Sequence, residues 1–192
     1  MEFGKLIPAL IFEIIGTIIL GVTISMEKDM AVAQYVLPFT AWIPYMLCWR
    51  ISNSHLNPAF TLICILRKDY NMGVVEGILY ILAQSLGFFI SNFLVWWMTR
   101  AVGTLNVWYY KGDFRFSEAS GMEFFGSLFF LLVHTLMLSK TTAVSHNWGI
   151  NSFIVGTFYG AIVFWAMQVT GGSFNPAYGF MKEAVDSMDS GK

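Results

Sequence analysis

The sequence predicts an all-α membrane protein with five transmembrane helices and two half-helices that enter the membrane without crossing it. Three observations predict this fold class. Hydrophobic residues make up 56% of the chain and charged residues only 12%, about half of the ~25% charged residues of soluble domains. Five apolar segments approach or reach the ~20 residues that a transmembrane helix needs. Two further apolar segments are much shorter, and each follows an Asn-Pro-Ala tripeptide.

Each tripeptide has the chemistry of a helix start. Asn is a favoured N-cap, and Pro at the first helical position gives up an N–H that the helix leaves unpaired anyway. A helix of about ten residues covers roughly 15 Å, half of a hydrocarbon core of ~30 Å. Two such helices that meet at the membrane centre therefore complete one span. The residues assigned to this centre are Asn57, Pro58, Ala59, Asn175, Pro176 and Ala177.

The spans follow from the apolar segments that lie between charged residues. The second span contains Pro38 and Pro44, which interrupt it but are tolerated in membrane helices. Gly156 and Gly160 in the fifth span predict a close approach to a neighbouring helix. The predicted spans are 6–25, 31–49, 74–98, 122–138 and 150–169, with half-helices at 60–66 and 178–184.

An internal repeat divides the chain into two halves of one domain, 1–192. The segment EIIGT at 13–17 matches EFFGS at 123–127, and an Asn-Pro-Ala tripeptide follows in each half. The repeats cover about 6–98 and 121–184, and 185–192 is a polar tail. Three crossings lie between the starts of the repeats, so the second copy is inverted, an arrangement that places functional sites at the membrane midplane.

These motifs resemble those of the aquaporins, the major intrinsic proteins. The resemblance rests on EIIGT, SHLNPAFTL, YILAQSLG, GMEFFGS and TGGSFNPA, in the order of that family. It implies a channel for water or another small neutral solute, in which Asn57 and Asn175 donate to passing oxygens. The positive ends of two half-helices at one point also raise the energy of protons and cations there, whereas neutral solutes are less affected.

The resemblance also assigns residues that support the re-entrant loops. Glu13 and Glu123 are expected to accept hydrogen bonds from loop backbone N–H groups, and His55 and Gln84 to hold the first loop. The alternative interpretation of the two acids is a proton-coupled transporter, because intramembrane carboxylates are functional candidates by default. His134, which has no counterpart in the family pattern, is interpreted as a satisfied buried histidine in preference to a gate.

The sequence departs from the family pattern at the narrowest point of the pore. Tyr178 replaces the Arg that usually follows the second tripeptide, and Val163 and Gly172 take two other positions of the filter. The fourth position falls on Leu37, or on Phe39 if Pro38 shifts the register. Without the Arg, the filter loses a cation barrier and its strongest donor. Either the path admits a less polar solute or Tyr178 closes it.

Two function classes remain open. The tail 185–192 is too short and polar for a sixth span, so a partner subunit or a bound lipid is expected beside the second half-helix. A non-conducting subunit of a larger membrane complex is therefore the alternative to a channel, and a homo-oligomer is also possible. Cys48 and Cys64 are interpreted as buried apolar residues, and no metal, cofactor or enzyme site is predicted. A net charge of −1 gives no basic patch for nucleic acid.

Overall fold

A computed structural model describes residues 3–26, 30–100, 116–167 and 169–189. These residues form helices and loops and contain no strand, so the all-α fold class is confirmed. A 3-10 turn at Lys68–Tyr70 follows the first short helix. The α-helices are α1 (Phe3–Met26), α2 (Met30–Ser52), α3 (Pro58–Leu66), α4 (Val74–Thr99), α5 (Phe116–Leu138), α6 (Trp148–Ala166) and α7 (Pro176–Asp189).

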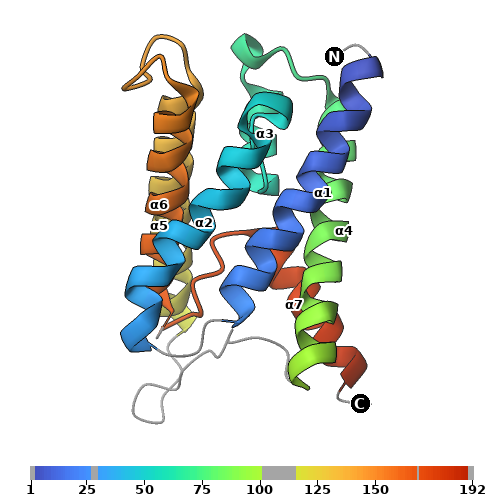
Figure 1. The fold of residues 1–192 in the computed structure, drawn as a ribbon, viewed down its shortest axis with the longest axis vertical. Coiled ribbons are helices and arrows are strands. Elements are labelled where there is room, and N and C mark those ends of the chain that lie inside the picture. Colours follow the sequence, from blue (N-terminus) through green and yellow to red (C-terminus); the bar gives the residue numbers. More distant parts are fainter. Residues whose placement is uncertain (1–2, 27–29, 101–115, 168, 190–192) are drawn as a thin grey trace.

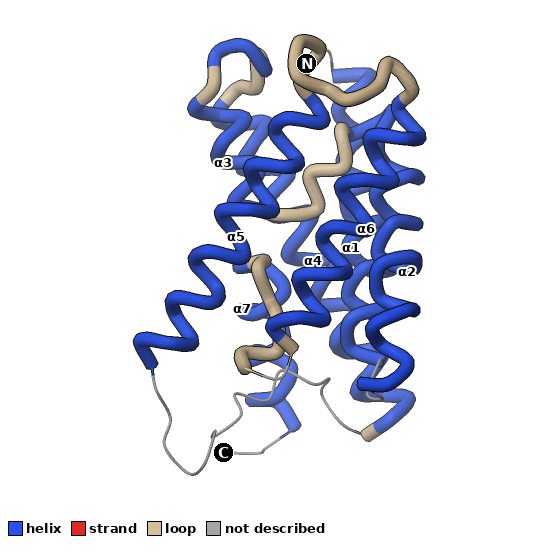
Figure 2. The backbone as a smooth tube through the Cα atoms, turned by 90° about the vertical axis from the view of Figure 1, so that its left-hand side faces the viewer, coloured by secondary structure: helices blue, strands red, loops and turns tan. Residues whose placement is uncertain are grey.

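Five of these helices, α1, α2, α4, α5 and α6, are long and apolar enough to cross a membrane. The short helices α3 and α7 enter the bundle from opposite ends, as Figure 1 shows. The loops that precede them run inside the bundle rather than over its surface (Figure 2). The structure therefore contains the predicted five spans and two half-helices.

The outside of the bundle is apolar, as expected for a surface that faces lipid. On α2, exposed large side chains recur every four residues and form one stripe, which is the spacing of a single helix face. Its members are Tyr35, Phe39, Ile43, Leu47 and Ile51, with exposed fractions between 39% and 68%. A soluble helix would place polar residues on this face.

Three features differ most from the sequence prediction. α2 continues through Pro38 and Pro44 without a break. α5 begins at Phe116, six residues before the start of the predicted span 122–138. α7 continues to Asp189, past the predicted end at 184 and into the segment expected to be a polar tail.

The extension of α7 has a simple physical reason. Tyr178, Lys182 and Val185 recur at helical spacing and are at most 5% exposed, so one face of the helix stays buried past residue 184. Glu183 on another face is exposed. Hydropathy alone does not reveal this helix, because it is amphipathic rather than apolar throughout.

Two glycines of α6 allow the backbones of α2 and α6 to touch. A methyl group at Gly156 would lie 2.4 Å from the Cα atom of Trp42, and one at Gly160 would lie 2.3 Å from the carbonyl oxygen of Leu37. Both obstacles are backbone atoms, which cannot move aside as a flexible side chain can. This packing fixes the position of the second repeat against the first.

We predict that Gly156→Ala and Gly160→Ala each lower the unfolding temperature of the purified protein, because overpacking costs about 1–3 kcal/mol. Gly121→Ala is the matched control. A methyl group at Gly121 meets nothing within 4 Å, and the change improves helix propensity within α5. Equal unfolding temperatures for all three variants would contradict the proposed backbone contact.

Candidate functional site

The two Asn-Pro-Ala tripeptides form equivalent helix starts inside the bundle. The side-chain oxygen of Asn57 accepts a hydrogen bond from the backbone N–H of Ala59 at 2.9 Å. Asn175 caps α7 in the same way, accepting from Ala177 at 3.2 Å. The side-chain oxygen of each Asn therefore caps its own helix, and its amide N–H groups can donate to other partners.

Each amide then bonds to the opposite repeat. The Nδ2 atom of Asn57 donates to the carbonyl oxygen of Phe174 at 2.8 Å, and that of Asn175 donates to the carbonyl oxygen of Leu56 at 2.7 Å. Leu56 and Phe174 both have left-handed backbone conformations, with φ of 46° and 41°, which are uncommon for such residues. The reciprocal pair joins the two re-entrant loops at the junction of α3 and α7.

Glu13 on α1 anchors the first loop. Its carboxylate is fully buried. It accepts from the backbone N–H groups of His55 at 3.0 Å and Leu56 at 2.7 Å, and from the side chain of Gln84 at 2.8 Å. The hydroxyl of Ser52 also donates a hydrogen bond to this carboxylate. Such a set of donors satisfies a carboxylate that would otherwise be costly inside a membrane.

Glu123 on α5 anchors the second loop in the same manner. It accepts from the backbone N–H groups of Ser173 at 3.1 Å and Phe174 at 2.8 Å, and from the hydroxyl of Thr170. The two acids thus hold corresponding loop positions. This geometry is that of a fixed anchor for each loop.

The sequence analysis missed the two hydroxyl donors. Ser52 and Thr170 bond the carboxylates of the two halves. Each lies five residues before the Asn of its motif, since 57 − 52 and 175 − 170 are both five. Ser52 and Thr170 therefore occupy equivalent positions of the two repeats. A residue-by-residue alignment of the two loops predicts that they have the same role.

We predict that Glu13→Gln lowers the free energy of unfolding by about 3 kcal/mol, because an amide cannot accept all the hydrogen bonds that the carboxylate accepts. Thermal unfolding in detergent measures the change. Asp186→Asn is the control, since Asp186 is exposed near the end of α7 and substitutions at exposed positions usually change stability by less than ~0.5 kcal/mol. A Glu13→Gln protein as stable as the control would contradict the anchoring role.

The four filter positions predicted from the sequence are all buried. Leu37 is 1% exposed and Val163 and Tyr178 are 0% exposed. Phe39 is 58% exposed on the outer stripe of α2, so Leu37 is the residue of this pair that faces inward. Gly172 has φ of +64°, and a methyl group there would lie 2.5 Å from the carbonyl oxygen of Val163. The structure therefore brings Gly172 against Val163.

Tyr178 reaches from α7 across to α1 and α4. Its hydroxyl lies 2.8 Å from the hydroxyl of Ser25, and its ring meets that of Phe88 edge-on at 5.4 Å. Ser25 also lies 3.4 Å from the side-chain oxygen of Asn92. The position that carries an Arg in the family pattern thus holds a buried side chain that packs against the neighbouring helices α1 and α4.

A second tyrosine lies at the tripeptide junction, and the sequence analysis missed it. Tyr159 donates to the carbonyl oxygen of Ser173 at 3.0 Å, two residues before Asn175. Its ring packs against Phe130 at 4.8 Å and Tyr45 at 6.0 Å. The inward position of Tyr159 could have been predicted from its spacing, because it lies about one helical turn before the filter position Val163 and therefore on the same face of α6.

His134 lies in an aromatic cluster beside this junction. Its ring stacks on Phe60 with 3.7 Å between centroids and lies 5.8 Å from Trp49 and 5.7 Å from Tyr45. Within the described part of the chain, neither ring nitrogen has a hydrogen-bond partner. The prediction of burial is correct, but stacking rather than hydrogen bonding holds the imidazole.

We predict that His134→Phe unfolds at the same temperature as the wild type or above it. The change keeps the stack and removes two buried nitrogens whose lost hydration costs about 1–3 kcal/mol. His134→Ala should instead cost about 2–5 kcal/mol through the cavity it leaves. A His134→Phe variant as unstable as His134→Ala would show that the imidazole nitrogens make a stabilising contact.

Comparison with known proteins identifies relatives of this arrangement. The family model described as Major intrinsic protein matches residues 5–187. The chain is 30% identical over 145 residues to Aquaporin TIP2-3 of Zea mays, covering 74% of this chain and 55% of that protein. It is 27% identical over 128 residues to Glycerol uptake facilitator protein-like 6 of Lactiplantibacillus plantarum, covering 66% and 58%. The chain thus spans little more than half the length of these curated relatives.

The fold also matches a solved structure. The X-ray structure of the aquaglyceroporin from Plasmodium falciparum superposes with a TM-score of 0.75 over 97% of this chain and 84% of that one. The two sequences are 17% identical, so this similarity establishes the arrangement of the helices and leaves the transported solute to other evidence.

Proposed function

Because the chain belongs to the major intrinsic protein family, we propose that it forms a transmembrane path for water or another small neutral solute, and that its own side chains close this path in the present conformation. Members of this family are membrane channels rather than enzymes. The family and the five apolar helices make the chain an integral multi-pass membrane protein.

The observation that carries the proposal is the junction of α3 and α7. The N-termini of both helices meet there, and each helix end contributes partial positive charge. The amide nitrogens of Asn57 and Asn175 each have two N–H groups, of which one bonds to the opposite loop. The other can donate to a solute oxygen on the path. This arrangement favours neutral oxygen-bearing solutes and disfavours cations.

The closure is inferred from burial. A water-filled path would leave the side chains along it accessible to water, whereas Leu37, Val163, Tyr178 and Asn57 are at most 1% exposed. Tyr178 bonds to Ser25 at the filter. At the junction, the hydroxyl of Tyr159 bonds to the carbonyl oxygen of Ser173, two residues before Asn175. Two tyrosines thus form two barriers in series.

The same dry interior supports a second candidate, a non-conducting subunit of a membrane complex. The two candidates predict different results when the tyrosine side chains are removed. A closed channel has a path that opens when both barriers are removed. A structural subunit has a packed interior in which the same changes leave cavities that do not connect.

We predict that proteoliposomes containing the wild type or either single variant, Tyr178→Ala or Tyr159→Val, show low osmotic permeability, since either barrier alone blocks the path. The double variant should raise the permeability several-fold. Stopped-flow light scattering measures water, and reswelling in glycerol measures a larger neutral solute, because the names of the two curated relatives refer to an aquaporin and to glycerol uptake.

Tyr35→Ala is the control for the loss of a tyrosine, because Tyr35 is 68% exposed on the outer face of α2. Its permeability should equal that of the wild type. If the double variant is inserted and folded but no more permeable than the control, the channel proposal is wrong and the non-conducting candidate remains.

A further inference from the structure

Three buried polar side chains from three helices meet beside the filter. Tyr178 of α7, Ser25 of α1 and Asn92 of α4 are all 0% exposed. The three helices lie side by side at this end of the bundle, as Figure 1 shows. The hydroxyl oxygens of Tyr178 and Ser25 are 2.8 Å apart, and the hydroxyl of Ser25 lies 3.4 Å from the Oδ1 atom of Asn92. The three groups therefore form one chain of hydrogen bonds.

The direction of this chain follows from Asn92. Its Nδ2 atom donates to the carbonyl oxygen of Phe88 at 2.9 Å, which leaves Oδ1 facing Ser25 as an acceptor. The single proton of the Ser25 hydroxyl is therefore donated to Asn92, and the Ser25 oxygen accepts the proton of Tyr178. Successive hydrogen bonds of this kind strengthen one another in a dry interior. Asn92 thus orients Ser25, and Ser25 orients Tyr178.

Close packing of α1 against α4 fixes the two acceptors of the chain. A methyl group at Gly21, about one helical turn before Ser25, would lie 2.1 Å from the hydroxyl oxygen of Ser91, the residue before Asn92. The two helices are therefore in contact where they carry Ser25 and Asn92. Tyr178 reaches this pair from α7, a helix that begins inside the bundle.

We propose that Ser25 and Asn92 form a latch that holds Tyr178 in the position that closes the path. This assignment rests on the channel function proposed above. In the closed position Ser25 satisfies the hydroxyl of Tyr178. Without Ser25 the same hydroxyl would be buried and unsatisfied, whereas in an open path it would bond to water. The latch therefore sets the balance between the closed and open positions. Ser25 and Asn92 are positioning residues, because they act on the path only through Tyr178.

The test measures osmotic permeability in proteoliposomes whose protein carries Tyr159→Val, so that the barrier at Tyr178 remains. In this background Ser25→Ala should raise the permeability about fivefold, toward that of Tyr178→Ala/Tyr159→Val, because a buried hydroxyl without a partner shifts the equilibrium by at least about this factor. Asn92→Ala should give a smaller rise, since it removes only the partner of Ser25. Ser25→Thr keeps a hydroxyl and should leave the permeability low.

A paired substitution separates the latch from a general loosening of the bundle. Tyr178→Phe removes the hydroxyl together with its need for a partner, and it keeps the ring that packs on Phe88. Replacing both partners of a buried hydrogen bond by apolar groups can be nearly neutral. Adding Tyr178→Phe to Ser25→Ala should therefore return the permeability to the background level. If Ser25→Ala only loosens the packing of α1, Tyr178→Phe will not reverse the rise.

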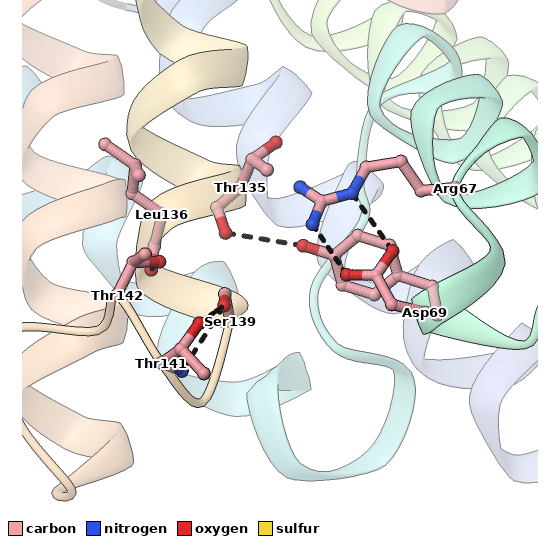
Figure 3. A network of polar contacts seen from close by, with 8 residues as sticks. Arg67, Asp69, Thr135, Leu136, Ser139, Thr141 and Thr142 are labelled. Atoms are coloured by element: carbon pink, nitrogen blue, oxygen red, sulfur yellow. Dashed lines mark hydrogen bonds and ion pairs between the residues drawn. The ribbon is translucent and has the colours of Figure 1, made fainter.

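Two other hydroxyls provide matched controls. Ser91 is buried on α4, but its hydroxyl donates to the carbonyl oxygen of Phe88 in its own helix. Ser139 and Thr141 form an exposed contact after the end of α5, with 3.0 Å between their hydroxyl oxygens, which Figure 3 shows. In the same background, Ser91→Ala and Ser139→Ala should leave the permeability unchanged.

Oxidation of Tyr178 by hydroxyl radicals, measured by mass spectrometry, reports on the latch without requiring that a solute cross the membrane. Oxidation should be low in the wild type and should rise in Ser25→Ala, and Asn92→Ala keeps the test available if Ser25→Ala does not fold. If Tyr178→Ala/Tyr159→Val does not conduct, the channel proposal fails and the latch has no path to close. If it conducts but Ser25→Ala leaves permeability and oxidation at the background level, only the latch is overturned. A rise that persists with Tyr178→Phe also overturns it.

Discussion

The structure depends on a reciprocal pair of hydrogen bonds between its two repeats. Asn57 donates to the carbonyl oxygen of Phe174, and Asn175 donates to that of Leu56. In a membrane interior no water is available to satisfy these backbone groups, so irregular loops persist there only when protein groups replace the water. Each bond also caps the opposite repeat's loop at the point where its helix begins. The two half-helices are consequently held as one unit.

The carboxylates of α1 and α5 extend this unit into the rest of the bundle. Glu13 and Glu123 each accept two loop N–H groups and one hydroxyl. The carboxylates fix the loops to α1 and α5, and Gly156 and Gly160 bring α6 of the second repeat against α2 of the first. In the channel that we propose, the side chains beside this unit control the access of solute. Two of them, Tyr178 and Tyr159, are fully buried.

The sequence predicted the architecture well because its signals are local. Asn-Pro-Ala marks a helix start, apolar length marks a span, and the repeat marks the inversion. It missed features that depend on tertiary contacts. The extension of α7 rests on a buried face whose neighbours are distant in sequence. Tyr159 is an ordinary aromatic residue in an apolar span until the fold brings its hydroxyl to the carbonyl oxygen of Ser173. Whether Leu37 or Phe39 faces inward depends on how α2 is rotated about its own axis. This rotation could not be predicted from the sequence because Pro38 lies between the two residues.

The central proposal is that two tyrosines of the protein itself close the path beside the half-helices and leave no room for a continuous row of water molecules. An experimental structure in a lipid bilayer, at a resolution that shows ordered water, tests it most directly. The account predicts the hydroxyl of Tyr178 in contact with that of Ser25, the hydroxyl of Tyr159 at the carbonyl of Ser173, and no water between the two levels. A continuous file of waters past Asn57 and Asn175, with Tyr178 turned away from Ser25, would contradict it.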